Sequence, residues 1–257
     1  MNPLDAITLA ALASVAHTGP TPLLATVSGA HLYGFASRDS DIDLRGAFVL
    51  PVNAVLRLRE PEETITITQQ HNGLDVDWVA HDVRKFARLM TRRNGYVLEQ
   101  LYSPLVVVGG AWLDELRAIG RGCIVRPLYH HYRGFAQRQL ELLAKPEATV
   151  KELLYAYRVL MTGIHVLKTG EVEANLVRLN ERFQLPGVNE LIQRKVTGAE
   201  TDRLLPSDFE THHTQLARLE AQMAEAFEQS RLPDEPTTFS ELDDFVARVR
   251  PELGTDG

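Results

Sequence analysis

The sequence predicts an α/β (α+β) fold, in which a mixed β-sheet is followed by a helical region. Short runs that are apolar, or that alternate between apolar and polar residues, fall within about the first 80 residues and are typical of strands. Farther along, longer segments carry apolar residues at helical spacing and are separated by Gly and Pro. We therefore expect a sheet-containing unit at residues 1–110 and a helical unit at residues 111–257.

The amino-terminal region is predicted to contain two helices around a set of strands. Apolar residues at helical spacing cover residues 4–15, and Gly19-Pro20 follows that helix. A second helix is expected over residues 83–90, with Asp82 as its N-cap. The turn His71-Asn72-Gly73 makes the last two strands a hairpin. The strands are expected at residues 23–27, 44–50, 64–68 and 74–79.

The carboxyl-terminal region is predicted to be helical throughout. Its helical segments are punctuated by turn-forming pairs such as Lys145-Pro146 and Thr169-Gly170. The final residues, 251–257, are expected to be disordered. The helices are expected over residues 112–119, 127–143, 149–168, 174–183, 189–196, 208–229 and 239–249.

Two polar segments between the first apolar runs carry the candidate chemistry. Ser28-Gly29 ends one run, and Asp41-Ile42-Asp43 opens the next. Side chains at i and i+2 of a strand share a face, so Asp41 and Asp43 point the same way. Two such carboxylates favour Mg²⁺, which takes oxygen ligands beside substrate phosphates. A Ser-Gly turn offers a hydroxyl and backbone N–H groups to a phosphate. The alternative is a polar hairpin with solvated acids.

These segments resemble the signature of the DNA polymerase β-type nucleotidyltransferase superfamily, in which a Ser-Gly pair and a spacer precede Asp-x-Asp. The longer string Tyr33-Gly34…Ser40-Asp41-x-Asp43-x-Arg45-Gly46 resembles the YcgL/RlaP-type family of predicted nucleotidyltransferases associated with RNA ligases. The resemblance covers most of residues 25–175. It implies a nucleotidyltransferase catalytic core at residues 1–110 and an α-helical domain at residues 111–257 that closes the cleft, with an acidic carboxyl-terminal part.

The resemblance also implies an activity. A metal-dependent enzyme of this type, with Mg²⁺ or Mn²⁺ as cofactor, transfers NMP from an NTP to a hydroxyl acceptor. The association with RNA ligases implies an RNA end as acceptor, a role in RNA repair or processing, and a functional link to an RNA ligase. Two alternatives stay open: an adenylyltransferase acting on a protein or small molecule, and a non-catalytic nucleotide-binding regulator.

In the superfamily a third carboxylate comes from a later strand and acts as general base or shared metal ligand. Asp75 and Asp77 share a face of the expected strand at residues 74–79. The segment Asp77-x-x-x-His81-Asp82-Val83-Arg84-Lys85-Phe86 resembles the corresponding family stretch, which favours Asp77. The resemblance therefore implies Asp41, Asp43 and Asp77 as catalytic and metal-binding residues. The alternative is that Asp75 and Asp77 only cap the edge of a hairpin.

Basic side chains near these acids are candidates for binding the triphosphate. Residues 83–98 include five Lys or Arg residues and no acid, and Arg84 and Lys85 come first. On the helix expected at residues 149–168, positions 151, 155 and 158 share one face. The alternative is that the basic residues of 83–98 and those at positions 151, 155 and 158 only form solvated faces of their helices. The candidate nucleotide-binding residues are Ser28, Gly29, Arg45, Arg84, Lys85, Lys151, Tyr155 and Arg158.

Arg45 is expected either to support the carboxylates or to bind phosphate itself. Residues 93–104 are similar to the family string Gly-Asn-Pro-x-x-Leu-Glu-x-Leu, with Gly95 in place of Pro, and Asn94 is expected to cap the next helix. The histidine that the family carries after Tyr155 is replaced by Ala156. Any contact made by that histidine cannot be transferred to this chain.

Composition excludes several other classes. A single cysteine, Cys123, rules out an internal disulfide framework and suits a reducing cytoplasm. No apolar run is long enough for a membrane span. No Gly-x-x-x-x-Gly-Lys-Ser/Thr or Gly-x-Ser-x-Gly motif occurs, so neither a P-loop NTPase nor a serine hydrolase is indicated.

The net charge of −7 is unevenly distributed. Residues 200–257 contain 14 acidic and 5 basic residues, a net charge of −9. The first 199 residues contain 20 acidic and 22 basic residues, a net charge of +2, so this part of the chain can meet an anionic substrate.

Overall fold

The protein is described by a computed structural model, which covers residues 6–71, 73–198 and 202–254. Contacts divide the chain into two compact units. The first comprises the chain up to Leu32, Asp41–Cys123 and the part from Pro236 onward, and the second comprises Tyr33–Ser40 and Ile124–Glu235. This division differs from the boundary expected at residue 110: residues 111–123 and the last helix belong to the sheet-containing unit, and residues 33–40 belong to the other unit.

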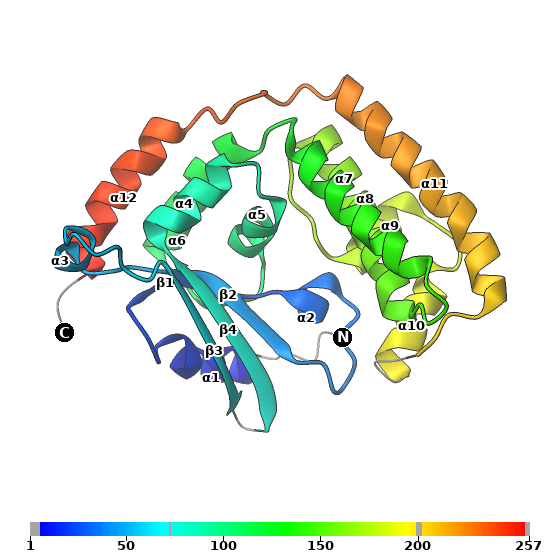
Figure 1. Cartoon of the computed structure of the whole chain (residues 1–257), viewed down its shortest axis with the longest axis horizontal. Coiled ribbons are helices and arrows are strands. Elements are labelled where there is room, and N and C mark those ends of the chain that lie inside the picture. Colours follow the sequence, from blue (N-terminus) through cyan, green and yellow to red (C-terminus); the bar gives the residue numbers. More distant parts are fainter. Residues whose placement is uncertain (1–5, 72, 199–201, 255–257) are drawn as a thin grey trace. The chain divides into compact units, whose positions relative to one another are not determined.

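The first unit is built on a mixed sheet, as predicted, with five strands where four were expected (Figure 1). The strand order is β3-β4-β2-β1-β5, with β2 and β4 parallel and the other neighbours antiparallel. The predicted hairpin between β3 and β4 is confirmed. The strands are β1 (Pro22–Val27), β2 (Ile42–Phe48), β3 (Thr64–His71), β4 (Leu74–Asp82) and β5 (Val106–Val108).

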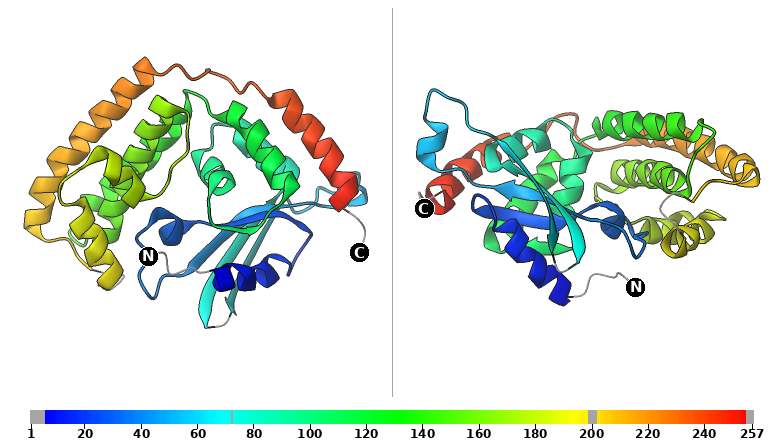
Figure 2. Two further views of the ribbon diagram at one scale, coloured as in Figure 1. Left: turned by 180° about the vertical axis from the view of Figure 1, so that it is seen from behind. Right: turned by 60° about the horizontal axis from the view of Figure 1, so that its bottom comes forward.

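Helices cover the two faces of this sheet differently. Helix α1 (Ala6–Ala16) packs its apolar side chains against one face, where Ile42, Leu44 and Trp78 form the core with it. Strand alternation turns Asp43, Arg45 and Asp77 to the opposite face. Helices α4 (Val83–Thr91), α5 (Gly95–Tyr102) and α6 (Ala111–Gly120) lie on that face (Figure 2).

Local capping explains where α4 and α5 begin. The Asp82 carboxylate accepts a hydrogen bond from the Arg84 backbone N–H at 3.0 Å, and the Asn94 side chain accepts one from Val97 N–H at 3.3 Å. Both predicted caps are thereby confirmed. Arg93, at φ 62°, lies in the left-handed region and lets the chain reverse between the two helices.

Two short helices and one strand were not expected. Ser28-Gly29 does not form a simple turn but opens helix α2 (Gly29–Tyr33). Helix α3 (Val52–Val55) and strand β5 are the others. All are five residues or shorter, too short for periodicity to reveal.

The second unit is helical, as predicted, and centres on helix α8 (Val150–Thr169), which is buried along most of its length. A capping box between Thr149 and Glu152 starts α8, and Gly170 in the left-handed conformation ends it. The other helices of this unit are α7 (Leu128–Leu143), α9 (Leu176–Phe183), α10 (Val188–Thr197) and α11 (Pro206–Gln229).

The last helix, α12 (Phe239–Leu253), returns to the first unit, as does the short 3₁₀ turn Arg121–Cys123. Residues 251–253, which were expected to be disordered, continue α12, and residues 255–257 lie outside the described part of the chain. None of the helices in the described ranges has the length and apolar character needed to cross a bilayer.

Candidate functional site

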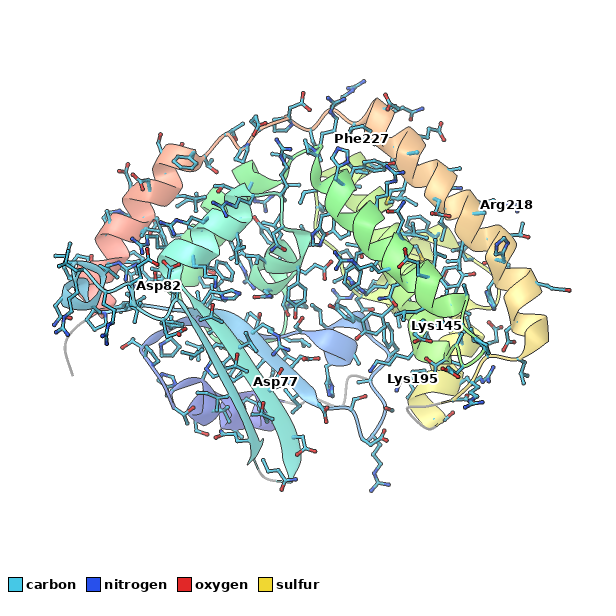
Figure 3. All side chains as sticks on the ribbon, in the orientation of Figure 1. Asp77, Asp82, Lys145, Lys195, Arg218 and Phe227 are labelled. Carbon is cyan, nitrogen blue, oxygen red and sulfur yellow. The ribbon has the colours of Figure 1, made fainter. Side chains whose placement is uncertain are left out.

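Asp43 and Asp77 are brought together by the pairing of β2 with β4. The parallel register sets Asp43 directly beside Asp77, and both side chains are about one-third exposed, at 34% and 35%. Asp41 is exposed and immediately precedes β2. In Figure 3, Asp77 lies part-way along β4, on the part of the strand that precedes Asp82.

The Arg45 guanidinium lies between the two acids and donates from every N–H group. Nε donates to the Tyr96 hydroxyl at 3.1 Å. Nη1 donates to the backbone carbonyls of Leu44 at 2.8 Å and Asp77 at 2.5 Å. Nη2 donates to Asp43 Oδ1 at 2.6 Å and to Asp77 Oδ2 at 2.9 Å. An arginine has five N–H donors, so none is left for a phosphate. These contacts favour the first of the two expected roles, support of the carboxylates.

The Nη2 group of Arg45 contacts one oxygen of each carboxylate, and the second oxygen of each lies against a different residue. Asp77 Oδ1 accepts a hydrogen bond from the Thr68 hydroxyl at 3.2 Å. Asp43 Oδ2 lies against Gly29: a Cβ built on that glycine would be 1.9 Å from it. The second Asp43 oxygen therefore faces the Ser-Gly segment singled out in the sequence.

Gly29 is required here by both conformation and space. Its φ of 59° is left-handed, and the absent side chain lets Asp43 approach the backbone. Ser28 precedes it and ties the two motifs together, since Ser28 N–H donates to the Asp43 carbonyl at 2.8 Å. The Ser28 hydroxyl is fully buried and has no hydrogen-bond partner among the described residues. A buried hydroxyl without a hydrogen-bond partner is suited to donate a hydrogen bond to an oxygen of a ligand.

The electrostatics show a surplus of negative charge. The pKa of Asp43 is raised, first by burial, and the neighbouring charges of Asp77 and Asp41 raise it further, although Arg45 and His31 oppose the shift. Burial by itself would lower the pKa of Arg45, but Tyr96 and the two acids outweigh it and the pKa is raised.

The donor set fits a divalent cation by chemistry and charge. Asp41, Asp43 and Asp77 carry three negative charges against the single positive charge of Arg45, and carboxylate oxygens are the ligands that Mg²⁺ prefers. The set is not preassembled, because no three His, Cys, Asp or Glu side chains converge into a ready metal site within residues 6–71, 73–198 and 202–254.

Arg84 and Lys85 are not brought to these acids. Arg84 donates to Glu63 at 2.8 Å, and Lys85 donates to the Thr64 hydroxyl at 2.5 Å. Thr64 pairs with His81, whereas Thr68 pairs with Asp77, four residues earlier in β4. At about 3.3 Å per residue this separation is roughly 13 Å. The structure therefore does not support the expected phosphate contacts of Arg84 and Lys85.

Lys151, Tyr155 and Arg158 lie on α8, in the helical unit. Lys151 and Tyr155 are half-buried. Arg158 is not an exposed cation: only 2% of it is accessible, and its guanidinium lies 4.0 Å from the centre of the Tyr33 ring. Arg158 and Tyr155 share a face of α8, as expected, with the Arg158 guanidinium 6.0 Å from the centre of the Tyr155 ring. The role of Lys151, Tyr155 and Arg158 in nucleotide binding stays a prediction.

Sequence analysis missed the residues that hold Arg45 and the acids, above all Tyr96 and Thr68. The alternation of β3 places Thr68 on the polar face, which is the one signal available for it. No pattern in the sequence indicated Tyr96, because this residue lies on a helix and is 51 residues beyond Arg45 in the chain.

Residues 4–248 match the profile of the RlaP family, described as an RNA repair pathway DNA polymerase beta family. The chain belongs to the RlaP family. The resemblance found in the motif around Asp41 and Asp43 is thereby confirmed across nearly the whole chain.

Several similar proteins cover most of this chain. The uncharacterized protein MJ0002 of Methanocaldococcus jannaschii is 27% identical over 227 residues, covering 86% of this chain and 90% of the relative. The uncharacterized protein YcgL of Bacillus subtilis is 27% identical over 244 residues, covering 91% of each. The match to a crystal structure of a nucleotidyltransferase-like protein from Exiguobacterium sibiricum covers 94% of this chain and 77% of that chain, with 12% identity and a TM-score of 0.31.

Proposed function

We propose that the protein is a metal-dependent nucleotidyltransferase that transfers NMP from an NTP to the hydroxyl of an RNA end during RNA repair. The single observation that carries this proposal is the arrangement at β2 and β4, where Asp43 and Asp77 are oriented by one arginine beside Ser28 and Gly29. Membership of an RNA repair pathway DNA polymerase beta family supports the reaction class and the choice of RNA.

The proposed reaction forms one bond and breaks one. The acceptor oxygen attacks the α-phosphorus of the NTP, and the bond from that phosphorus to pyrophosphate breaks. Asp77 accepts the proton of the acceptor hydroxyl as general base. The buried Ser28 hydroxyl and the Gly29 N–H hold the terminal phosphates. Arg45 keeps both carboxylates in place throughout.

Asp41, Asp43 and Asp77 are the residues that would hold Mg²⁺ or Mn²⁺. When bound, such an ion supplies positive charge to the phosphate oxygens. The pKa of Asp43 is raised first by burial and further by the charges of Asp77 and Asp41, which a bound cation would compensate.

The roles of the acids are tested by substitution. Asp41→Asn and Asp77→Asn are each expected to reduce the transfer of α-³²P-labelled nucleotide by at least about a hundredfold, since a proposed metal ligand is lost. Asp75→Asn is the matched control, because Asp75 is an exposed acid on the same strand and is expected to be dispensable. Equal activity of Asp77→Asn and Asp75→Asn, with both proteins folded, would contradict the assignment.

The acceptor is tested by supplying labelled ATP, CTP, GTP and UTP in turn, with and without RNA of defined ends. Label that appears on RNA supports the proposal. Label that appears on protein or on a small molecule regardless of RNA indicates the adenylyltransferase alternative instead. Nucleotide binding without any transfer by the wild-type protein indicates the regulator.

A further inference from the structure

Tyr96 is the second residue of helix α5, and its ring is 37% exposed while the following residues of the helix are buried. Its hydroxyl accepts the hydrogen bond from Arg45 Nε at 3.1 Å. Nε is the one nitrogen of Arg45 whose donor is not used on a strand, since the other four N–H groups contact residues of β2 and β4. Tyr96 therefore connects α5 to the group that bridges the two acids.

Helix α5 is tied to the sheet in its last turn. There the Thr26 hydroxyl of β1 donates to the Gln100 carbonyl at 2.9 Å, while Asn94 caps the first turn of the helix. The helix thereby carries the Tyr96 hydroxyl to Arg45 of β2, where it can fix the plane of the guanidinium.

We infer that Tyr96 is a positioning residue of the proposed reaction: its hydroxyl fixes the plane of Arg45, and Arg45 in turn sets the orientation of Asp43 and Asp77. Only the catalytic part of this inference, the effect of Tyr96 on nucleotide transfer, rests on the proposed function. A guanidinium is planar, so fixing Nε also fixes the directions in which Nη2 reaches the two carboxylates. Without the hydroxyl, the guanidinium retains its four remaining bonds but can tilt, and the carboxylates tilt with it.

The geometry also explains why an exposed tyrosine, and not a phenylalanine, is needed at this position. An aromatic ring alone would cover the same apolar surface. Only the hydroxyl gives Nε a protein acceptor, and this bond lies at an exposed edge of the site. Arg45 itself is half-buried, with 12% of its side chain accessible, so that without the hydroxyl its Nε–H would turn to solvent water, which does not fix the plane of the guanidinium.

The experiment compares Tyr96→Phe with Tyr102→Phe in the full-length protein. Both residues lie on α5, and both substitutions remove one hydroxyl. The Tyr102 hydroxyl donates to the Arg117 carbonyl at 2.8 Å and has no contact with the acids, which makes it the matched control. Three readouts are measured for each protein: protection of the Arg45 Nε–H by NMR, Mn²⁺ affinity by electron paramagnetic resonance, and kinetics of nucleotide transfer.

We expect Tyr96→Phe to abolish the protection of the Arg45 Nε–H, to weaken Mn²⁺ binding several-fold, and to lower kcat about tenfold with little change in the KM for NTP. Tyr102→Phe should leave all three at wild-type values. An Arg45 Nε–H that stays protected in Tyr96→Phe overturns the inference, and so does a protein whose Mn²⁺ affinity and kcat are unchanged. A wild-type protein without transfer refutes the proposed function, whereas the NMR readout still decides whether Tyr96 holds Arg45.

Discussion

At the scale of single residues, the site depends on Gly29, which has no side chain, and on Arg45, whose N–H donors are all used. Gly29 lets Asp43 approach the backbone, and Arg45 uses all five of its donors to hold two carboxylates and the strands that carry them. Neither residue reacts in the proposed mechanism. Each determines where the acids lie.

Gly29→Ala is expected to displace Asp43. The new Cβ would be 1.9 Å from Asp43 Oδ2, and the left-handed backbone by itself costs an alanine about 1–2 kcal/mol. We expect a loss of stability beyond that figure and at least about a tenfold loss of Mn²⁺ affinity. Urea unfolding and Mn²⁺ titration measure the two effects.

Gly73→Ala is the control for this substitution. Gly73 has a similar φ of 78°, but no atom lies within 4 Å of the Cβ position. It should show the backbone cost alone and bind Mn²⁺ normally. If Gly29→Ala binds Mn²⁺ as tightly as Gly73→Ala, the close approach of Gly29 and Asp43 is not needed by the site.

At the scale of elements, one buried carboxylate joins three segments of the first unit. Asp82 caps α4, accepts a hydrogen bond from Leu50 N–H at 3.1 Å, and forms a bidentate ion pair with Arg250 of α12, at 2.7 and 3.0 Å. Asp82 is completely buried. This pair is one of the contacts that tie the last helix to the sheet-containing unit.

Arg250→Met is expected to destabilise the protein by about 3–5 kcal/mol, because it leaves the Asp82 carboxylate buried without its cation. Arg248→Met is the control, since Arg248 lies two residues earlier on α12 and pairs with Glu115 at the surface. An exposed pair contributes little to stability. Chemical denaturation of the two variants should separate them clearly, and similar unfolding midpoints would contradict the role given to Asp82.

A second pair joins helices of the other unit. The Tyr157 hydroxyl of α8 lies 2.7 Å from His212 Nδ1 of α11, and both side chains are buried. Burial lowers the pKa of His212, although Asp208 and Glu190 oppose the shift. A histidine with a lowered pKa in the folded state binds protons more readily when the chain is unfolded, so stability is lost as the pH falls below about 6.5.

We therefore expect the free energy of unfolding to decrease between pH 7.5 and pH 5.5. His212 contributes at most about 1.4 kcal/mol per pH unit to that slope. His212→Gln should reduce the slope, and His213→Gln, at an exposed neighbouring position, should not. Urea unfolding at several pH values measures this, and identical slopes for both variants would exclude His212 as a source of the effect.

At the scale of the whole molecule, the chain passes between the two units four times, and two of these passages lie within the motif, between Ser28-Gly29 and Asp41. Residues 33–40 separate Ser28-Gly29 from Asp41, yet they belong to the helical unit. Lys195 of α10 donates to the Ser37 hydroxyl at 2.9 Å, and Gly34, at φ 85°, lies against the Asn175 side chain. The segment between the two halves of the motif is therefore held by helices distant in sequence.

Gly34→Ala is expected to loosen this segment. The Cβ would be 2.8 Å from the Asn175 amide, which caps α9 by accepting a hydrogen bond from Arg178 N–H. We expect faster hydrogen exchange in residues 33–40 and in α9, together with weaker Mn²⁺ binding, because Asp41 directly follows the segment. Gly170→Ala, also at a left-handed position but with 3.4 Å to its nearest neighbour, controls for the backbone cost. Unchanged exchange in α9 would argue against the contact.

The sequence by itself determined the elements and the motif. Period-two alternation located β3 and β4 and predicted that Asp75 and Asp77 share a face, and helical spacing with capping residues located α4 and the long helices. The family followed from residues 28–46, because the spacing between Ser28-Gly29 and Asp41 is local and is written in the chain. Such features depend on neighbours a few residues apart.

Only the tertiary structure decided which side chains meet. The Arg45–Asp77 pair spans 32 residues, and the Arg250–Asp82 pair spans 168. In the sequence, three cations looked equally suited to bind phosphate: Arg84, Lys85 and Arg158. In the structure, residues from other segments pair with Arg84 and Lys85 and bury Arg158. The physical reason is that charge and periodicity are local properties, whereas the partner of a polar group is set by strand register and helix packing.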